Sequence, residues 1–163
     1  KMEKAGVTIE EFEDAVRVTR QGDLEALNIK TMPHPGFPTD MQPLMTVMLT
    51  LANGTSIVTE GIWENRFRYV DELSRMGVNI QVAGRVAVIE GVQELLPAPM
   101  RATDLRAGAA MVVAALAANG VSEISEIDHI ERGYEDIVEK LRGLGADIKR
   151  IEKPDGIALK QAQ

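Results

Sequence analysis

The stretch Met76-Gly77-Val78-Asn79-Ile80 decides the fold, because it ends one kind of element and begins another. A glycine just past a helix adopts the left-handed conformation that closes the helix, and the β-branched residues after it favour a strand. Two related stretches, Ala5-Gly6-Val7-Thr8-Ile9 and Leu144-Gly145-Ala146-Asp147-Ile148, lie at nearly equal spacing on either side of it. The chain therefore repeats a helix-to-strand junction.

Two amphipathic segments lie between these junctions, and both begin with Thr-Asp. We expect helices from Thr39-Asp40 to Asn53-Gly54 and from Thr103-Asp104 to Asn119-Gly120. Their apolar residues recur at the spacing of a buried helical face. These residues are Met41, Leu44, Met45, Met48 and Ala52 in the first helix, and Leu105, Gly108, Ala109, Val112, Ala115 and Leu116 in the second. Each Thr-Asp pair is predicted to cap its helix.

Each of these helices is followed by a predicted strand (55–59 or 121–125), a second helix, and a hairpin. The second helices carry their apolar residues at Phe67, Val70, Leu73 and Met76, or at Tyr134, Ile137, Val138, Leu141 and Leu144. The hairpins turn at Gly84-Arg85, joining 80–82 to 86–89, and at Pro154-Asp155-Gly156, joining 148–151 to 157–159. The unit is strand-helix-strand-helix-strand-strand, present in about two copies after the tail of a third. Residues 1–163 are thus predicted to form one α/β domain with mixed sheets, and the opening residues 1–6 the end of a helix in a longer protein.

Composition narrows the functional classes. The chain has 163 residues, with 18 Lys+Arg against 25 Asp+Glu and a net charge of -7. This acidic balance argues against a nucleic-acid partner. The absence of cysteine excludes a disulfide framework, a thiolate metal site and a cysteine nucleophile within these residues. No apolar run approaches 18 residues and no signal peptide is visible, so we expect a soluble, cytoplasmic protein with no membrane partner.

Three arginines, Arg66, Arg106 and Arg132, lie within or just before the first turn of predicted helices. A cation there opposes the helix dipole by about 0.3–1 kcal/mol. A bound anion would reverse that penalty and would also use the free backbone N–H groups. The alternative is that each arginine pairs with its neighbouring acid on a solvated surface. Those acids are Glu64, Asp104 and Glu131.

Asp40 follows a loop with three prolines, Pro33 to Pro38. Such a stiff loop suits a general base, but a helix N-terminus lowers an aspartate's proton affinity, so Asp40 would need burial or a closed site to act near neutral pH. As caps, Asp40 and Asp104 need no catalytic function. The two histidines, His34 and His129, are too few for a metal site, and we predict no metal or cofactor.

Four segments closely resemble, in the same order, the C-terminal signatures of the UDP-N-acetylglucosamine 1-carboxyvinyltransferase family. They are Pro35-Gly36-Phe37-Pro38-Thr39-Asp40-Met41-Gln42, Glu64-Asn65-Arg66-Phe67, Ala102-Thr103-Asp104-Leu105-Arg106-Ala107 and Arg132-Gly133-Tyr134-Glu135. The resemblance covers essentially the whole chain. It implies a bacterial cytoplasmic enzyme of two similar domains, each an inside-out α/β barrel of three βαβαββ units around buried helices. This chain would be a partial C-terminal domain, and the N-terminal domain its partner.

The resemblance also implies the chemistry. The family transfers the enolpyruvyl group of phosphoenolpyruvate to the 3-hydroxyl of UDP-N-acetylglucosamine, which commits the cell to peptidoglycan synthesis, and thus serves cell-wall growth, cell shape, the cell cycle and division. Asp40 matches the aspartate that contacts the sugar and takes the hydroxyl proton, and Ile62 a position whose backbone contacts the nucleotide sugar. The implied catalytic residues are Asp40, Asp104, Arg106 and Arg132, and the implied substrate-binding residues are Thr39, Asp40, Ile62, Trp63, Arg66, Arg106 and Arg132.

The chain departs from the family pattern in several places. His34 stands where an aromatic residue is more common, and Trp63 where phenylalanine is usual. The family's loop cysteine, its Lys-Asn pair and the opposing domain are absent, so the isolated chain is predicted to be inactive. Two alternatives remain: the sister enzyme, 3-phosphoshikimate 1-carboxyvinyltransferase, and a non-catalytic ligand-binding or structural module.

Overall fold

The computed structural model describes residues 1–152 of the chain. The strands are β1 (Val7–Glu11), β2 (Val16–Arg20), β3 (Leu24–Glu25), β4 (Ile29–Lys30), β5 (Ala52–Asn53), β6 (Thr55–Thr59), β7 (Asn79–Ala83), β8 (Val86–Glu90), β9 (Pro99–Arg101) and β10 (Glu123–Ser125). The α-helices are α1 (Gln42–Leu49), α2 (Val70–Ser74), α3 (Leu105–Ala117), α4 (Asp128–Glu131) and α5 (Ile137–Gly143), and the 3-10 helices are η1 (Glu3–Ala5), η2 (Thr39–Met41) and η3 (Arg66–Tyr69).

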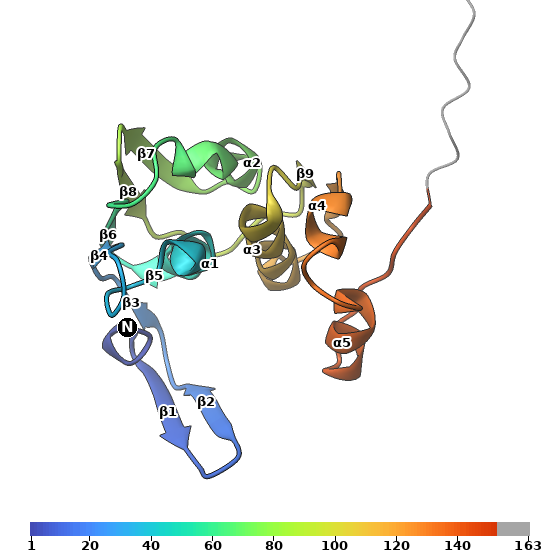
Figure 1. Cartoon of the computed structure of the whole chain (residues 1–163), viewed down its shortest axis with the longest axis horizontal. Helices are drawn as coiled ribbons and strands as arrows, with labels where there is room; N and C mark the ends of the chain where they lie inside the picture. The colour runs from blue at the N-terminus through green and yellow to red at the C-terminus, as the bar shows by residue number, and fades with distance from the viewer. Residues whose placement is uncertain (153–163) are drawn as a thin grey trace, which may run out of the picture.

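Helices α1 and α3 pack against each other in the middle of the molecule (Figure 1). The four-stranded sheet, in the order β4-β6-β8-β7, lies on one side of them, and α4 and α5 lie on the other. The β1–β2 hairpin extends away from this body. The fold is therefore mixed α/β with several small sheets, as the sequence predicts.

Each central helix connects two parallel strands. Helix α1 lies between β4 and β6, and α3 lies between β9 and β10. Parallel strands need such a crossover because a tight turn cannot join them. Strand β8 pairs antiparallel with both β6 and β7. The two crossovers place the N-termini of α1 and α3 close together, and this is where the candidate site forms.

Several predicted elements are confirmed. Strand β6 covers residues 55–59, and the turn at Gly84-Arg85 joins β7 to β8. The junction glycines Gly6 and Gly77 have φ values of 87° and 80°, which the left-handed helix-closing conformation requires. The apolar residues predicted for the helix before Gly77 are buried, namely Phe67, Val70, Leu73 and Met76.

Four predicted element boundaries are wrong. Helix α1 ends at Leu49, because Ala52 and Asn53 form β5 and pair with β3. Helix α3 ends at Ala117, before Asn119-Gly120. Strand β10 begins at Glu123, two residues late, and Val121 is 91% exposed. Residues 148–151 form no strand, since no described strand pairs with them; their predicted partner, 157–159, and the turn at Pro154-Asp155-Gly156 lie outside the described residues.

The central helices are buried on more than one face. On α1 the buried residues include Gln42, Thr46 and Val47, which lie off the predicted stripe, whereas Met41, on the stripe, is 45% exposed. Leu116, on the predicted stripe of α3, is also exposed. An amphipathic pattern assumes one solvent face, but other elements surround α1 on most sides. Within residues 1–152 no helix combines the length and the apolar character that crossing a bilayer demands.

Candidate functional site

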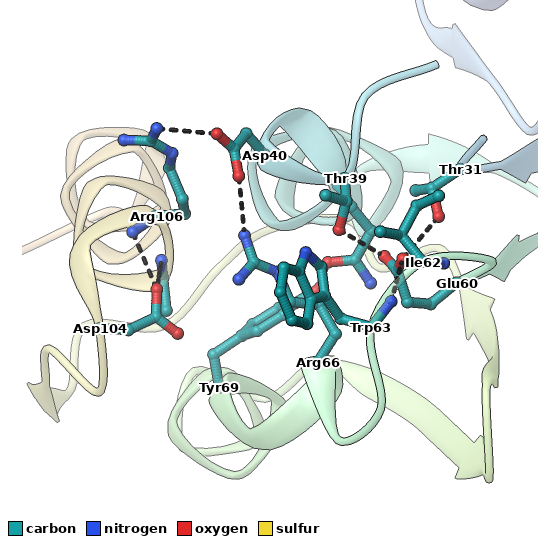
Figure 2. Close-up of polar contacts among 12 residues, drawn as sticks. Thr31, Thr39, Asp40, Glu60, Ile62, Trp63, Arg66, Tyr69, Asp104 and Arg106 are labelled. Carbon is teal, nitrogen blue, oxygen red and sulfur yellow. Dashed lines mark hydrogen bonds and ion pairs between the residues drawn. The ribbon is translucent and has the colours of Figure 1, made fainter. Parts of the chain in front are cut away.

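Asp40 lies between two arginines that come from distant parts of the sequence (Figure 2). Its Oδ2 accepts a hydrogen bond from Arg106 Nη2 at 2.7 Å, and its Oδ1 lies 3.3 Å from Arg66 Nη2. Asp40 belongs to η2, Arg66 is the first residue of η3, and Arg106 is in the first turn of α3. The fold thus brings three of the predicted site residues into direct contact.

The two arginines change how Asp40 titrates. The hydrogen bond from Arg106, together with the positive charges of Arg106 and Arg66, lowers the pKa of Asp40 against the opposing effect of burial. In turn, the hydrogen bond to Asp40 raises the pKa of Arg106. The Asp40 side chain is 52% exposed, so solvent screens this pair. At neutral pH Asp40 is a carboxylate beside two cations.

The alternative that each arginine pairs with its neighbouring acid is wrong for Arg66 and Arg106, and Arg132 has no ion pair within the described residues. The neighbouring acids have other partners: Glu64 pairs with Arg85, Asp104 accepts backbone N–H groups, and Glu131 pairs with Arg150. Arg66 and Arg106 are therefore held at the N-termini of their helices by a single shared carboxylate.

The two Thr-Asp pairs behave differently. Asp104 caps α3, because its Oδ1 accepts hydrogen bonds from the N–H groups of Arg106 (2.8 Å) and Ala107 (2.9 Å). The predicted cap by Asp40 is wrong, since no side chain caps η2 or α1. Asp40 lies inside the 3-10 turn rather than before it, and α1 itself begins at Gln42 followed by a proline.

Glu60 is a central residue that the sequence analysis missed. Its side chain is only 1% exposed, and its carboxylate accepts four hydrogen bonds. The donors are Thr31 Oγ1 (2.7 Å), Thr39 Oγ1 (2.9 Å), Ile62 N (2.8 Å) and Trp63 N (3.1 Å). Burial alone would raise the pKa of Glu60, but these hydrogen bonds outweigh it and the pKa is lowered. The only signal in the sequence is an acid between a strand and a glycine.

Thr39, Ile62 and Trp63, all predicted to bind substrate, lie around this carboxylate (Figure 2). The Trp63 side chain is 59% exposed. The turn is tight at Gly61, where a Cβ would lie 2.4 Å from the carbonyl oxygen of Thr31. Two of the predicted substrate-binding residues, Ile62 and Trp63, thus lie in one turn, and Glu60 bonds that turn to Thr39 in the segment that carries Asp40.

Arg132 does not begin a helix, contrary to the sequence prediction. It lies just after α4, and α5 starts only at Ile137. The arginine side chain is exposed, and within residues 1–152 it makes no hydrogen bond or ion pair. The turn still packs beside the start of α3, because the Leu105 side chain leaves no room for a Cβ at Gly133. Tyr134, in the same turn, also interacts with Arg106 and contributes to its raised pKa. Arg132 is therefore near the site but not part of the Asp40 cluster, which consists of Asp40, Arg66 and Arg106.

A buried polar group lies beneath the cluster. Tyr69, 1% exposed, donates a hydrogen bond to Gln42 Oε1 at 3.1 Å, and burial raises the pKa of its hydroxyl. Gln42 Nε2 has no partner within the described part of the chain. Among these same residues no group of three or more His, Cys, Asp or Glu side chains is arranged to hold a metal ion.

The Asp40 side chain is half exposed to solvent, whereas that of Arg66 is mostly buried. Two cavities, of about 420 and 750 Å³, lie elsewhere, one beside β4 and β6 and the other between the 131–139 segment and Arg150. Neither is lined by Asp40, Arg66 or Arg106. A carboxylate, two guanidinium groups and a rigid turn on one face suit the recognition of an anionic ligand.

Comparisons with known proteins find relatives that match nearly the whole chain. The chain is 56% identical over 94% of its length to UDP-N-acetylglucosamine 1-carboxyvinyltransferase 3 of Caldanaerobacter subterraneus subsp. tengcongensis, and 55% identical over 92% to UDP-N-acetylglucosamine 1-carboxyvinyltransferase 2 of Clostridium acetobutylicum. The crystal structure of the enolpyruvyl transferase NikO from Streptomyces tendae matches 94% of the chain with a TM-score of 0.85 and 32% identity. The chain spans 37%, 36% and 36% of these proteins, respectively.

A family model supplies the assignment. The model described as EPSP synthase (3-phosphoshikimate 1-carboxyvinyltransferase) matches residues 1–141, which include β1 to α4 and the whole Asp40 cluster. The mixed α/β fold and this match over most of the chain point to the same family. The chain belongs to the EPSP synthase family of enolpyruvyl transferases.

Proposed function

We propose that this chain is part of a UDP-N-acetylglucosamine 1-carboxyvinyltransferase, in which it supplies one wall of the active cleft. The observation that carries the proposal is Asp40 shared by Arg66 and Arg106, a base surrounded by groups that bind anions. The names and identities of the curated relatives support the same acceptor sugar. The reaction opens peptidoglycan synthesis in the cytoplasm, and through it serves cell-wall growth, cell shape and division.

The proposed chemistry is addition followed by elimination. The 3-hydroxyl oxygen of UDP-N-acetylglucosamine bonds to C2 of phosphoenolpyruvate while its proton passes to Asp40, and an acid in the rest of the enzyme donates a proton to C3. The resulting tetrahedral intermediate breaks its C2–O bond, and phosphate leaves with the electron pair and takes up the proton that Asp40 accepted. The conjugate base of the same acid then removes a proton from C3, which restores the double bond. The chain has no cysteine, so the loop cysteine of the family would come from the rest of the enzyme.

Phosphoenolpyruvate must compete with Asp40 for the arginines. Its phosphate and carboxylate groups accept paired hydrogen bonds from guanidinium groups. When they draw Arg106 and Arg66 away, the interactions that lower the pKa of Asp40 are lost, and Asp40 becomes a better proton acceptor. Substrate binding would thus activate the base. Arg132, exposed and without an ion pair in the described residues, is the remaining cation proposed to approach the substrate.

The turn at Ile62 is proposed to bind the acceptor sugar through its carbonyl. The N–H of Ile62 is already used by Glu60. Its carbonyl oxygen accepts no hydrogen bond from any residue between 1 and 152, so it is available to a sugar hydroxyl or amide. Trp63 offers an exposed ring beside it, and Asp104 supports the site by orienting the start of α3.

The finer architecture belongs to the same proposal. We take the chain as a partial C-terminal domain of an inside-out α/β barrel, with about two βαβαββ units after the tail of a third, facing a second domain of the same enzyme. Since half a cleft cannot close over its substrates, the isolated chain would be inactive. Phosphate release from phosphoenolpyruvate and UDP-N-acetylglucosamine by the purified chain would contradict this.

The test is a set of NMR titrations of the chain with UDP-N-acetylglucosamine, phosphoenolpyruvate and shikimate 3-phosphate. Selective shifts at Asp40, Ile62 and Trp63 with the nucleotide sugar are expected, and Arg106→Gln should weaken those with phosphoenolpyruvate. Arg142→Gln, which removes an exposed helix arginine paired with Glu139, is the matched control. Shifts with shikimate 3-phosphate alone would favour the sister enzyme, which the description of the family model keeps as the second candidate. Shifts with none of the three would mean either that binding needs the other domain or that the chain is a non-catalytic module, and adding the other domain separates these two outcomes.

A further inference from the structure

Glu60 connects three separate segments. Thr31 follows β4, Thr39 begins η2, and Ile62 and Trp63 lie in the turn after β6. All three segments donate hydrogen bonds to one buried carboxylate. Sequence separations of 29 and 21 residues to the two threonines exclude a merely local turn.

The division of the bonds between the two oxygens is informative. Oε1 accepts from Thr31, Ile62 and Trp63, whereas Oε2 accepts from Thr39 alone. Thr31 Oγ1 also accepts the N–H of Gly61 at 2.8 Å, which closes the turn. One oxygen therefore shapes the turn, and the other joins it to the residue next to Asp40.

We propose that Glu60 is a positioning residue that sets the distance between the Ile62–Trp63 turn and Asp40. This inference rests on the proposed function for its catalytic meaning: the turn would hold the acceptor sugar and Asp40 would take its proton. Because Glu60 is bonded to both the turn and the segment of Asp40, it would keep the sugar hydroxyl close to the Asp40 carboxylate. Glu60 itself touches neither substrate, because its oxygens are buried and occupied. Rigid placement of this kind supports proton transfer.

Glutamine at position 60 provides a conservative test. Its carbonyl oxygen can keep the three bonds made by Oε1, and its NH₂ group can donate to the Thr39 hydroxyl, which also accepts. Alanine removes all four bonds. Glu64→Ala is the matched control: Glu64 lies in the same turn, and its 80% exposed carboxylate pairs with Arg85 alone among residues 1–152.

The experiment compares these variants of the chain by amide hydrogen exchange at Ile62 and Trp63 and by the carboxyl carbon signal of Asp40. We expect Glu60→Ala to speed exchange at both amides by about tenfold or more, since each loses its acceptor. It should also shift the Asp40 carboxyl carbon signal, since Thr39, the residue next to Asp40, loses its bond to Oε2. Glu60→Gln and Glu64→Ala should stay within about threefold of the parent. Unchanged exchange and an unchanged Asp40 signal in a folded Glu60→Ala chain would overturn the proposal.

Thr39→Val keeps the proposal testable if Glu60→Ala does not fold, because it removes only the bond to Oε2. It should shift the Asp40 signal while exchange at Ile62 and Trp63 stays unchanged; no shift would overturn the link between turn and base. These readouts need no ligand. Titration of the parent chain with UDP-N-acetylglucosamine, followed by the fluorescence of Trp63, its one tryptophan, tests the proposed function separately.

Discussion

The two Thr-Asp pairs of this chain have the same sequence but different roles. Asp104 is extended at the N-cap of α3, with φ -162° and ψ 178°, and binds two backbone N–H groups. Asp40 lies within a 3-10 turn, binds none, and instead is bonded to Arg66 and Arg106. The difference lies in where the α-helix begins: α3 starts at Leu105, directly after Asp104, whereas α1 starts at Gln42, two residues after Asp40. A capping motif thus becomes a candidate base when the helix begins late.

The largest expected effect distinguishes the two aspartates by activity. In the complete enzyme proposed above, Asp40→Asn should lower kcat by about 100-fold or more, the usual contribution of a general base, which is the role proposed for Asp40. The free energy of unfolding of the chain should change by less than about 0.5 kcal/mol, since the Asp40 carboxylate is 52% exposed and solvent screens its ion pairs. Asp14→Asn, in the exposed β1–β2 turn, is the control. Activity within threefold of the parent would remove Asp40 from the mechanism.

The converse change should affect stability. Asp104→Ala removes the cap of α3 and should lower the free energy of unfolding by about 1 kcal/mol. Urea denaturation, compared with the Asp14→Ala control, measures it. If Asp40→Ala is equally destabilising, the contrast between the two aspartates does not hold.

The threonines of the two motifs give a smaller contrast. Thr39 Oγ1 is bonded to Glu60, whereas Thr103 Oγ1 is buried with no partner in the described residues. Thr39→Val should therefore lower the free energy of unfolding by about 1 kcal/mol, the loss of one partly buried hydrogen bond. Thr103→Val should be neutral or stabilising, because a methyl replaces an unpaired hydroxyl. Thermal unfolding of both variants measures the two changes in stability. Equal changes would contradict the difference in hydrogen bonding between the two threonines.

The smallest effect concerns acid pH. The pKa of Asp40 is lowered from its ordinary value of 3.8, so the native state binds the proton less readily than the unfolded chain. The stability from this group is present above that value and is lost as pH falls through the lowered pKa. Arg106→Gln removes the main cause, so the pKa should rise and the acid-dependent loss should shrink.

An NMR titration of the Asp40 carboxyl carbon, with urea denaturation at neutral pH and at about pH 3, measures both quantities. Arg142→Gln is again the control, because its partner Glu139 is on the same helix and exposed. An unchanged Asp40 pKa in Arg106→Gln would mean that this arginine does not hold the carboxylate in solution.

Much of the local structure could be predicted from the sequence. The closing glycines Gly6 and Gly77, strand β6 and the hairpin turn at Gly84-Arg85 all follow from backbone preferences and periodicity over a few residues. The same local reasoning identified Arg66 and Arg106 as cations poorly placed for their helix dipoles. It failed at the end of α1, where pairing of β5 with β3 stops the helix.

What joins these pieces was decided only in three dimensions. The partners of Asp40 lie 26 and 66 residues away, and Glu60 reaches back 29 residues to Thr31. Arg132 was expected at a helix start and lies at a helix end. Local patterns report what a backbone prefers over one or two turns, whereas a buried carboxylate selects its donors from every segment that the sheets bring together, since leaving it unpaired would be costly. Helices and strands are thus determined largely by residues close in the sequence, whereas the candidate site depends on residues that only the tertiary structure brings together.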